Sequence, residues 1–206
     1  MKILILNYGI GNLISVKNML KKAGTSDVLI SSNPQEIKNA DKLILPGVGH
    51  FDFGMRKLKS SGLIPVIEQK VFEEGVPILG ICLGAQLMTK SSEEGVEDGL
   101  GWVDAQTVSF DKTKIGSALK IPHMGWNYVN PFKDSMLFEG MHSDPRFYFV
   151  HSYHFKMNQP DDIWLQTEYG YEFCAAYQRD NIFACQFHPE KSHKFGLKLM
   201  ENFVKF

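Results

Sequence analysis

The segment GICLG places a single cysteine, Cys82, between two glycines where an apolar run gives way to a helical pattern. This is the form glycine–x–nucleophile–x–glycine on a strand-to-helix turn, in which the glycines let neighbouring chains approach without a clashing Cβ. The thiol would then point into a cleft, and the N-terminus of the next helix would favour the reactive thiolate. The alternative is a small buried apolar residue, as free cysteines often are. The elbow alone leaves both interpretations open.

A cysteine nucleophile needs a base, and the base needs an acceptor that orients it. The segment CQFHPEKS offers His188 and Glu190 two residues apart at the end of an apolar run. In extended geometry both side chains would project from the same face, and Pro189 argues against a helix between them. By itself this spacing is usually a solvated strand end. Together with the elbow it predicts a base and its orienting carboxylate.

Acyl transfer also needs donors for the negative charge that develops on the attacked carbonyl. Leu83 follows the nucleophile in the first turn of the next helix, so its amide would point at whatever the thiol attacks. The segment LPGVGHF offers a flexible Gly-Val-Gly at a second strand end, and one such donor is worth roughly 3–4 kcal/mol. Taken alone, that segment is better explained as an ordinary strand-to-helix loop.

Strands and helices alternate through the first half of the chain, which predicts βαβ units and a parallel sheet. Ligands of such sheets bind at the carboxyl ends of the strands, where the glycine-rich loops 46–49 and 80–84 both lie, so we expect these loops to be neighbours. In this half we expect strands over 2–6, 27–31, 42–49 and 76–81, and helices ending at Gly24, starting after Asn33, near 52–60 and 64–74, and from about Leu83.

After Gly95 the chain carries aromatic and β-branched runs with tight turns, which predict a mostly antiparallel or mixed sheet. The fold class we expect is therefore α/β, with residues 1–206 as a single domain. Its central, mostly parallel sheet would be flanked by helices and joined to a more antiparallel, β-rich second half. The expected strands of this half lie within 102–110, 147–153, 162–169, 172–178 and 182–188, and a helix over 192–206 closes the chain.

Composition narrows the function classes. The chain has 206 residues, 44% of them hydrophobic, and a formal charge of −1, which is ordinary for a folded soluble protein and gives no basic field for nucleic acid. No window reaches the roughly 18 apolar residues of a membrane span, and the first residues read as a strand rather than a secretion signal. Three cysteines cannot form a disulfide framework, so we expect the cytoplasm. We expect neither a metal nor a cofactor.

The segments GICLGAQLM and FHPE resemble the class I, triad-type glutamine amidotransferases, whose Cys, His and Glu hydrolyse the side-chain amide of glutamine. The elbow and HPE specify only this superfamily. PHMGWN, VHSY and HPEKS are similar to the glutaminase subunits of imidazole glycerol phosphate synthases. The matching segments fall in order along nearly the whole chain: NYGIGNL, LPGVGHF, SEEG, GLGW, IPHMGWN, FYFVHSY and DNIFACQFHPEKS.

The resemblance implies a mechanism. Cys82 would attack the glutamine carboxamide, His188 would move protons and Glu190 would orient it. A glutamyl thioester would form, ammonia would leave and water would complete the hydrolysis. The resemblance also implies an oxyanion hole made by the backbone amides of Val48 and Leu83.

By the same resemblance glutamine would be bound by a set of backbone and side-chain groups, from Gly49, Gln86, Glu94, Ser152 and Tyr153. Gln86 has independent support because it lies four residues after Cys82, on the same face of the elbow helix. Glu94 could receive the ammonium group of the substrate, and its alternative is a solvated loop charge.

The family's partner is a cyclase subunit of the (β/α)8 barrel type. The resemblance implies a heterodimer in which ammonia passes to that barrel, which makes imidazole glycerol phosphate and AICAR in histidine biosynthesis. The residues that match the family's docking and gating surface are Asn12, Trp126, Tyr148 and Lys191. Core packing is the alternative for Trp126 and Tyr148, and an ordinary surface lysine for Lys191.

Small departures from the family pattern keep other functions open. Ala85 stands where many relatives have a bulkier residue, His154 stands where an aromatic is expected, and SEEGVEDGLGW is unusually acidic. A paralogous glutaminase that supplies ammonia for sugar or surface-glycan amidation, with a different synthase partner, is one alternative. A cysteine hydrolase of the same fold, such as a γ-glutamyl peptidase, and an inactive binding module are the others. We interpret Cys174 and Cys185 as core positions.

Overall fold

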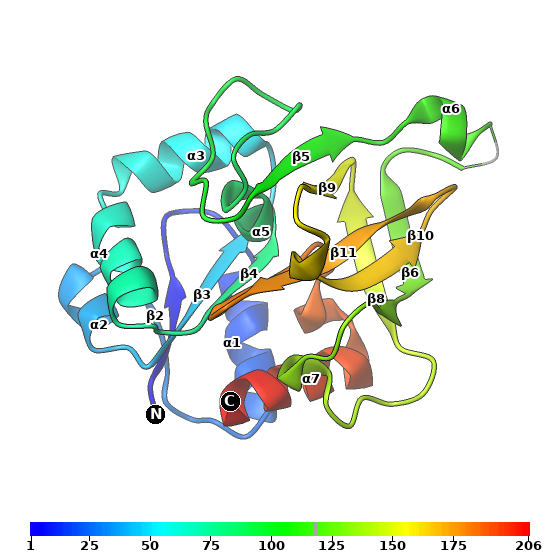
Figure 1. Cartoon of the computed structure of the whole chain (residues 1–206). Helices are drawn as coiled ribbons and strands as arrows, with labels where there is room; N and C mark the ends of the chain where they lie inside the picture. The colour runs from blue at the N-terminus through cyan, green and yellow to red at the C-terminus, as the bar shows by residue number, and fades with distance from the viewer. Residues whose placement is uncertain (118) are drawn as a thin grey trace.

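The computed structural model describes residues 1–117 and 119–206. Its centre is a sheet of ten strands in which β2, β1, β3, β4 and β12 follow one another in space and run parallel (Figure 1). This confirms the expected α/β class with a mostly parallel sheet. The parallel strands are β1 (Ile3–Leu6), β2 (Val28–Ser31), β3 (Lys42–Gly47), β4 (Ile78–Cys82) and β12 (Ile182–Cys185).

Helices cover both faces of the parallel strands, because neighbouring residues of a strand point to opposite faces. Leu4 and Leu6 belong to a hydrophobic core under α2 to α5, while Ile3 and Ile5 belong to a second core under α1 and α7. The helices are α1 (Leu13–Lys22), α2 (Pro34–Lys38), α3 (Phe51–Ser60), α4 (Ile64–Glu68), the π-helix η1 (Gln69–Glu73), α5 (Leu83–Leu87), α6 (Lys112–Ile115) and α7 (His193–Lys205). No helix among the described residues is long and apolar enough to cross a membrane.

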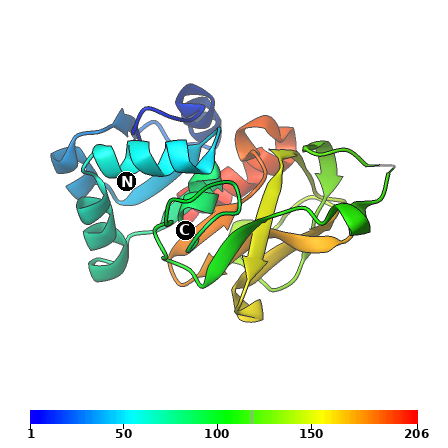
Figure 2. The same ribbon diagram turned by 90° about the horizontal axis from the view of Figure 1, so that it is seen from above.

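The second half of the chain is antiparallel, as expected. Figure 2 shows its strands, green to orange, gathered on one side of the blue and cyan elements. β11, β10 and β7 extend the sheet beyond β12, β9 pairs with β11 and β5, and β6 and β8 form a separate two-stranded sheet. Their bounds are β5 (Ala105–Ser109), β6 (His123–Tyr128), β7 (Asn130–Pro131), β8 (Arg146–His151), β9 (Tyr153–Met157), β10 (Ile163–Glu168) and β11 (Glu172–Arg179), with 3-10 helices η2 (Met136–Phe138), η3 (Pro160–Asp162) and η4 (Pro189–Lys191).

Three local expectations differ from the structure. The run 147–153 is not one strand: β8 ends at His151, β9 begins at Tyr153, and the two belong to different sheets. The expected helix 64–74 changes to π-helical hydrogen bonding at Gln69. β6 was not expected as a strand, because its apolar residues are interrupted by Gly125, which has a φ of +126°.

The two glycine-rich loops are neighbours, as the alternation of strands and helices predicted. β3 and β4 pair in parallel with Gly47 opposite Cys82, so both loops leave the same edge of the sheet. β12 lies on the other side of β4, with Cys185 opposite Ile81. The carboxyl ends of β3, β4 and β12 therefore meet, and this edge is where the sequence places its reactive residues.

Candidate active site

Cys82 stands on a strained turn between β4 and α5, as the elbow predicted. Its φ of +53° is rare for a residue other than glycine. Both flanking glycines are required by close packing: a Cβ on Gly84 would lie 1.8 Å from the carbonyl oxygen of Leu45, and one on Gly80 would lie 2.8 Å from the Cα of Ala85. Backbone strain held by the surrounding structure is typical of functional sites.

His188 follows β12 and meets Glu190, with His188 Nδ1 2.8 Å from Glu190 Oε1. The local geometry differs from the extended one we expected, because Pro189 begins the 3-10 helix η4. Proline disfavours helix in the residue before it but suits the first helical position, since its φ is already helical. The turn is closed by Ser192, whose hydroxyl donates to the carbonyl of His188.

The electrostatics of this pair favour a protonated imidazole. Burial lowers the pKa of His188, but Cys82 and Glu190 stabilise the imidazolium and raise the pKa to about 10. The Glu190 side chain is only 1% exposed, and its Oε2, like the Nε2 of His188, has no hydrogen-bond partner among the described residues. A buried carboxylate is costly unless a positive charge accompanies it, so Glu190 and the imidazolium stabilise each other.

The loop after β3 packs directly against the elbow. A Cβ on Gly47 would lie 2.6 Å from the backbone nitrogen of Gly84, so only glycine lets the two strand ends approach this closely. Tyr8 anchors the start of the loop, since its hydroxyl donates to the carbonyl of Pro46 at 2.7 Å. The Val48 side chain is exposed, and Gly49 has a φ of +106°. Sequence reasoning missed Tyr8, whose partner lies 38 residues along the chain.

One pocket of about 460 Å³ opens at this edge of the sheet. Glu190 does not line it but contacts it through His188, and Asn12, Trp126 and Tyr148 do not line it either. Sequence reasoning missed three lining residues, Pro122, Val150 and His151. The predicted residues that the structure brings together around the pocket are Val48, Gly49, Cys82, Leu83, Gln86, Glu94, Ser152, Tyr153, His188 and Lys191.

Gln86 is held by an internal network beneath the thiol. Its Nε2 donates to Gln186 Oε1 at 2.9 Å and to the carbonyl of Tyr153 at 3.3 Å. Gln186 Nε2 lies 3.7 Å from the Cys82 sulfur. Gln186 was also missed, although its place two residues before His188, in the run 182–188 that the sequence predicts as a strand, was the signal that could have found it.

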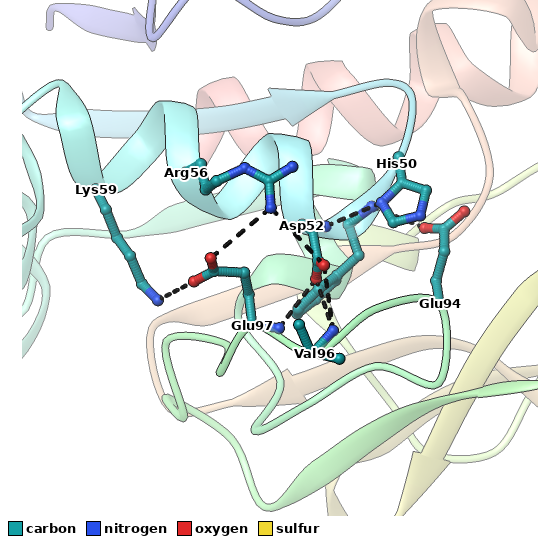
Figure 3. A network of polar contacts seen from close by, with 8 residues as sticks. His50, Asp52, Arg56, Lys59, Glu94, Val96 and Glu97 are labelled. Carbon is teal, nitrogen blue, oxygen red and sulfur yellow. Dashed lines mark hydrogen bonds and ion pairs between the residues drawn. The ribbon is translucent and has the colours of Figure 1, made fainter.

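Glu94 is tied to the N-terminus of α3, so it is not a freely solvated loop charge. Its Oε2 accepts the backbone N–H of Phe51 at 2.8 Å (Figure 3). Two and three residues further on, the same acidic segment is held by Asp52, whose Oδ1 accepts the backbone N–H groups of Val96 and Glu97, both at 3.0 Å. The side chain of Glu94 is thus fixed beside the loop that follows β3.

The same acidic segment carries surface ion pairs. Arg56 on α3 lies 3.8 Å from both Asp52 and Glu97, and Lys59 lies 2.7 Å from Glu97 (Figure 3). These pairs are partly exposed and contribute little individually. The partly buried hydrogen bonds to Asp52 are the stronger restraint. The Asp52 carboxylate also leaves no room for a side chain at Gly95, where a Cβ would lie 1.9 Å from Asp52 Oδ1.

Three of the four predicted interface residues lie on one face. Trp126 on β6 is 43% exposed, which rules out core packing for it. It pairs with Tyr148 across the small sheet, and Lys191 Nζ lies 5.6 Å from the centre of the Tyr148 ring. Lys191 also lines the pocket, so this face and the pocket are continuous. Asn12 precedes α1 and caps none of its amides with its side chain.

The other cysteines have the properties of core residues. Cys174 and Cys185 are buried and unpaired, and burial raises the pKa of both thiols. Cys82 is the cysteine that lines the pocket. Among the described residues no group of three His, Cys, Asp or Glu side chains could hold a metal ion.

Comparison with known proteins gives a consistent result. Residues 4–206 match the family model described as glutamine amidotransferase class-I. The chain is 52% identical to the imidazole glycerol phosphate synthase subunit HisH 2 of Methanococcus maripaludis and 48% identical to the subunit of that name in Pseudomonas aeruginosa. Both alignments span 203 residues, 98% of this chain and 98% of each relative.

Solved structures share the fold at lower identity. A glutamine amidotransferase matches with a TM-score of 0.72 at 18% identity, covering 97% of this chain and 99% of that chain. The PurLQS structure from Thermotoga maritima matches with a TM-score of 0.68 at 17% identity, covering 99% of this chain and 97% of that chain. Likeness at this identity shows a common architecture.

Proposed function

Because the chain belongs to the class-I glutamine amidotransferase family, we propose that it is the glutaminase subunit of an imidazole glycerol phosphate synthase. It hydrolyses L-glutamine to glutamate and ammonia, and the ammonia serves a partner subunit in histidine biosynthesis. The observation that carries this proposal is the pocket at the ends of β3, β4 and β12. A thiol, an imidazole held by a carboxylate, and the loops that follow β3 and β4 meet at this pocket. The chain that carries them is about half identical to two HisH subunits.

The first half of the reaction forms a thioester. The sulfur of Cys82 attacks the carboxamide carbon of glutamine, and the negative charge moves to the amide oxygen. The backbone N–H groups of Val48 and Leu83 stabilise that oxygen, as donors aimed at a developing oxyanion do. His188, protonated in the resting site, gives its proton to the amide nitrogen, the carbon–nitrogen bond breaks, and ammonia leaves.

The second half consumes water. Neutral His188 takes a proton from a water molecule, whose oxygen attacks the thioester carbon, and the carbon–sulfur bond breaks to release glutamate. Glu190 holds the imidazole by its Nδ1 throughout, so Nε2 faces the reacting atoms in both steps. The imidazolium is regenerated with the Cys82 thiolate, and the site is ready for the next glutamine.

Glutamine binding uses the rest of the pocket. Gly49, Gln86 and the segment 152–153 line it, and the carboxylate of Glu94 reaches it from the α3 side. Glu94 pairs with the substrate's ammonium group. Ser152 lies at the break between β8 and β9, outside both strands, so its backbone groups are available to the substrate.

We place the partner on the face that carries Trp126, Tyr148 and Lys191, with Asn12 just before the start of α1. Free ammonia is mostly protonated in neutral water, so transfer to an acceptor requires a closed path. A (β/α)8 barrel cyclase docked there as a heterodimer would take the ammonia through its interior. Unpaired cysteines suit a reducing compartment, and we propose the cytoplasm for the complex.

The test is glutamate release from glutamine in three mixtures: the chain alone, the chain with a cognate barrel cyclase, and both with the ribonucleotide substrate of histidine synthesis. We expect little release alone and strong activation in the full mixture. Cys82→Ala should abolish it, whereas Cys185→Ala, a buried cysteine off the pocket, should retain it.

Each other outcome has a definite meaning. Activation by the cyclase without any response to the ribonucleotide would favour the glycan-amidating paralogue. Activity of the lone chain on γ-glutamyl peptides would favour a peptidase. No release in any mixture, with Cys82→Ala indistinguishable from the unaltered chain, would overturn the glutaminase.

A further inference from the structure

A chain of hydrogen bonds between two buried histidines ends at the glutamine pocket. His151, the last residue of β8, lines the pocket, and its Nδ1 lies 2.7 Å from the carbonyl oxygen of Tyr153. Its Nε2 lies 2.9 Å from Nδ1 of His123, the residue opposite it on β6. Nε2 of His123 lies 3.3 Å from Nδ2 of Asn127. The chain therefore connects β6 with the segment 152–153.

The donor and acceptor roles along this chain follow from which atoms carry hydrogen. A carbonyl oxygen only accepts, so His151 carries its proton on Nδ1, and its Nε2 is an acceptor while the ring is neutral. That acceptor needs a proton on Nδ1 of His123, whose Nε2 then accepts from the amide of Asn127. Burial lowers the pKa of both imidazoles, that of His123 to about 4, so both rings are neutral at pH 7.

The carbonyl oxygen of Tyr153 accepts two side-chain hydrogen bonds. It accepts from His151 on one side and from Gln86, on the elbow helix, at 3.3 Å on the other. A carbonyl held by two donors fixes the rotation of its peptide plane. The neighbouring backbone of the segment 152–153 is oriented with it.

We propose that His123 is a positioning residue of the glutamine pocket, acting through His151 on the carbonyl of Tyr153. The proposal rests on the proposed function, in which the segment 152–153 binds glutamine. Without the donor on His123, the buried Nε2 of His151 would lack a partner, which is costly. The His151 ring would turn or admit water, and the carbonyl of Tyr153 would lose its fixed orientation.

Packing is the competing explanation, because His123 also stacks on Phe149 and Tyr169, with ring centres 4.8 Å and 4.1 Å away. Two variants separate these roles. His123→Phe keeps an aromatic ring in the stack but removes the donor. His123→Asn removes the ring but keeps an N–H near the position of Nδ1.

The kinetic test measures KM for glutamine and kcat in the full complex with the cyclase and its ribonucleotide. We expect His123→Phe to raise KM about tenfold, equivalent to about 1.4 kcal/mol, with kcat changed by less than about twofold. His123→Asn should keep KM within about threefold of the unaltered complex, because its side-chain N–H preserves the hydrogen bond to His151, which is worth about 1 kcal/mol. A His123→Asn complex as impaired as His123→Phe, or more so, would show that His123 only packs.

The matched control is His154→Phe. His154 is a third buried histidine, and it packs, like His123 and His151, against Phe110, with its ring centre 4.9 Å from that of Phe110. Its Nε2 lies 2.8 Å from the Tyr171 hydroxyl, outside the chain to Tyr153. We expect its KM to match that of the unaltered complex. A tenfold rise there too would mean that any change in the cluster disturbs the pocket, and would overturn the specific role of His123.

A second measurement does not depend on activity. Imidazole nitrogen-15 spectra of the unaltered chain should show both His123 and His151 with the proton on Nδ1. The backbone amide resonances of Tyr153 and His154 should shift in His123→Phe and remain in place in His123→Asn. A proton on Nε2 of His151 would overturn the proposal. A complex that hydrolyses no glutamine would overturn the proposed function instead, and these spectra would still decide the role of His123.

Discussion

At the scale of single residues, His188 shows how two opposing effects set one pKa. Burial favours the neutral ring, yet Cys82 and Glu190 raise the pKa to about 10, well above the ordinary 6.5. A group whose pKa is higher in the folded chain binds its proton more tightly there. Its contribution to stability is therefore complete below about pH 6.5 and is lost as the pH rises towards 10.

Glu190→Gln tests this balance. The amide cannot stabilise the imidazolium as the carboxylate does. The lowering effect of burial is then opposed less, and the pKa of His188 should fall. The unfolding free energy of the unaltered chain should then exceed that of Glu190→Gln most at pH 6, and the gap should narrow by pH 10. Urea unfolding at both values, with imidazole nitrogen-15 titration of His188, measures it. His142→Gln, at an exposed histidine, is the control, and a gap that widens with pH would contradict the assignment.

At the scale of elements, the N-terminus of α3 holds the segment that carries Glu94. Asp52 accepts two backbone N–H groups of that segment, and its side chain is only 11% exposed. Asp52→Asn would turn one of its acceptors into a donor facing those N–H groups. We expect the unfolding free energy to fall by about 1–3 kcal/mol and KM for glutamine to rise, because Glu94 would no longer be fixed.

The control for this prediction is Asp98→Asn, an exposed carboxylate next to the same segment. Thermal unfolding and glutaminase kinetics of the complex should leave Asp98→Asn unchanged. If Asp52→Asn lowered stability without any change in KM, the network would support the fold alone, and the restraint on Glu94 would be refuted.

The elements were predictable where local signals agree. The alternation of apolar runs with capped helices indicated the parallel sheet, and the glycines around Cys82 indicated the elbow. The break between β8 and β9 was not predictable, because residues 147–153 form one continuous β-prone run. Ser152 ends β8 only because the two strands join different sheets, and such long-range pairing leaves no mark in the local sequence.

The site was predictable in type more than in detail. A histidine followed by a carboxylate two residues on also occurs at His50–Asp52 and at His142–Asp144, so spacing alone could not select His188. The structure separates them: Nδ1 of His50 accepts the backbone N–H of Asp52 at the start of α3. Tyr8 and His151 were missed because their roles depend on partners brought near only by the fold.

At the scale of the whole molecule, the parallel sheet is fastened to the C-terminal helix by one buried cation. Lys42, at the start of β3, is 3% exposed. Its Nζ donates to the carbonyl oxygens of Phe203 and Phe206, both at 2.7 Å, and of Val204 at 3.1 Å. A helix C-terminus leaves such carbonyls without partners and carries partial negative charge. Lys42 therefore joins segments about 160 residues apart, and α7 packs against the face of the sheet that carries Cys82.

Lys42→Met tests whether this contact between β3 and the end of α7 stabilises the folded chain. Three carbonyls lose a donor, so the unfolding free energy should fall by about 1–3 kcal/mol at pH 7.

Burial lowers the pKa of Lys42 to about 8, against a smaller raising effect of Asp41. The folded chain thus releases this proton before the unfolded chain does, and between about pH 8 and 10.5 the contribution of Lys42 to stability rises with pH. The gap between the unaltered chain and Lys42→Met should widen from pH 7 to pH 10 in urea unfolding, whereas Lys38→Met, at an exposed lysine, should show no gap at either pH. A constant gap would mean that the folded and unfolded chains bind this proton equally, and it would contradict the lowered pKa of Lys42.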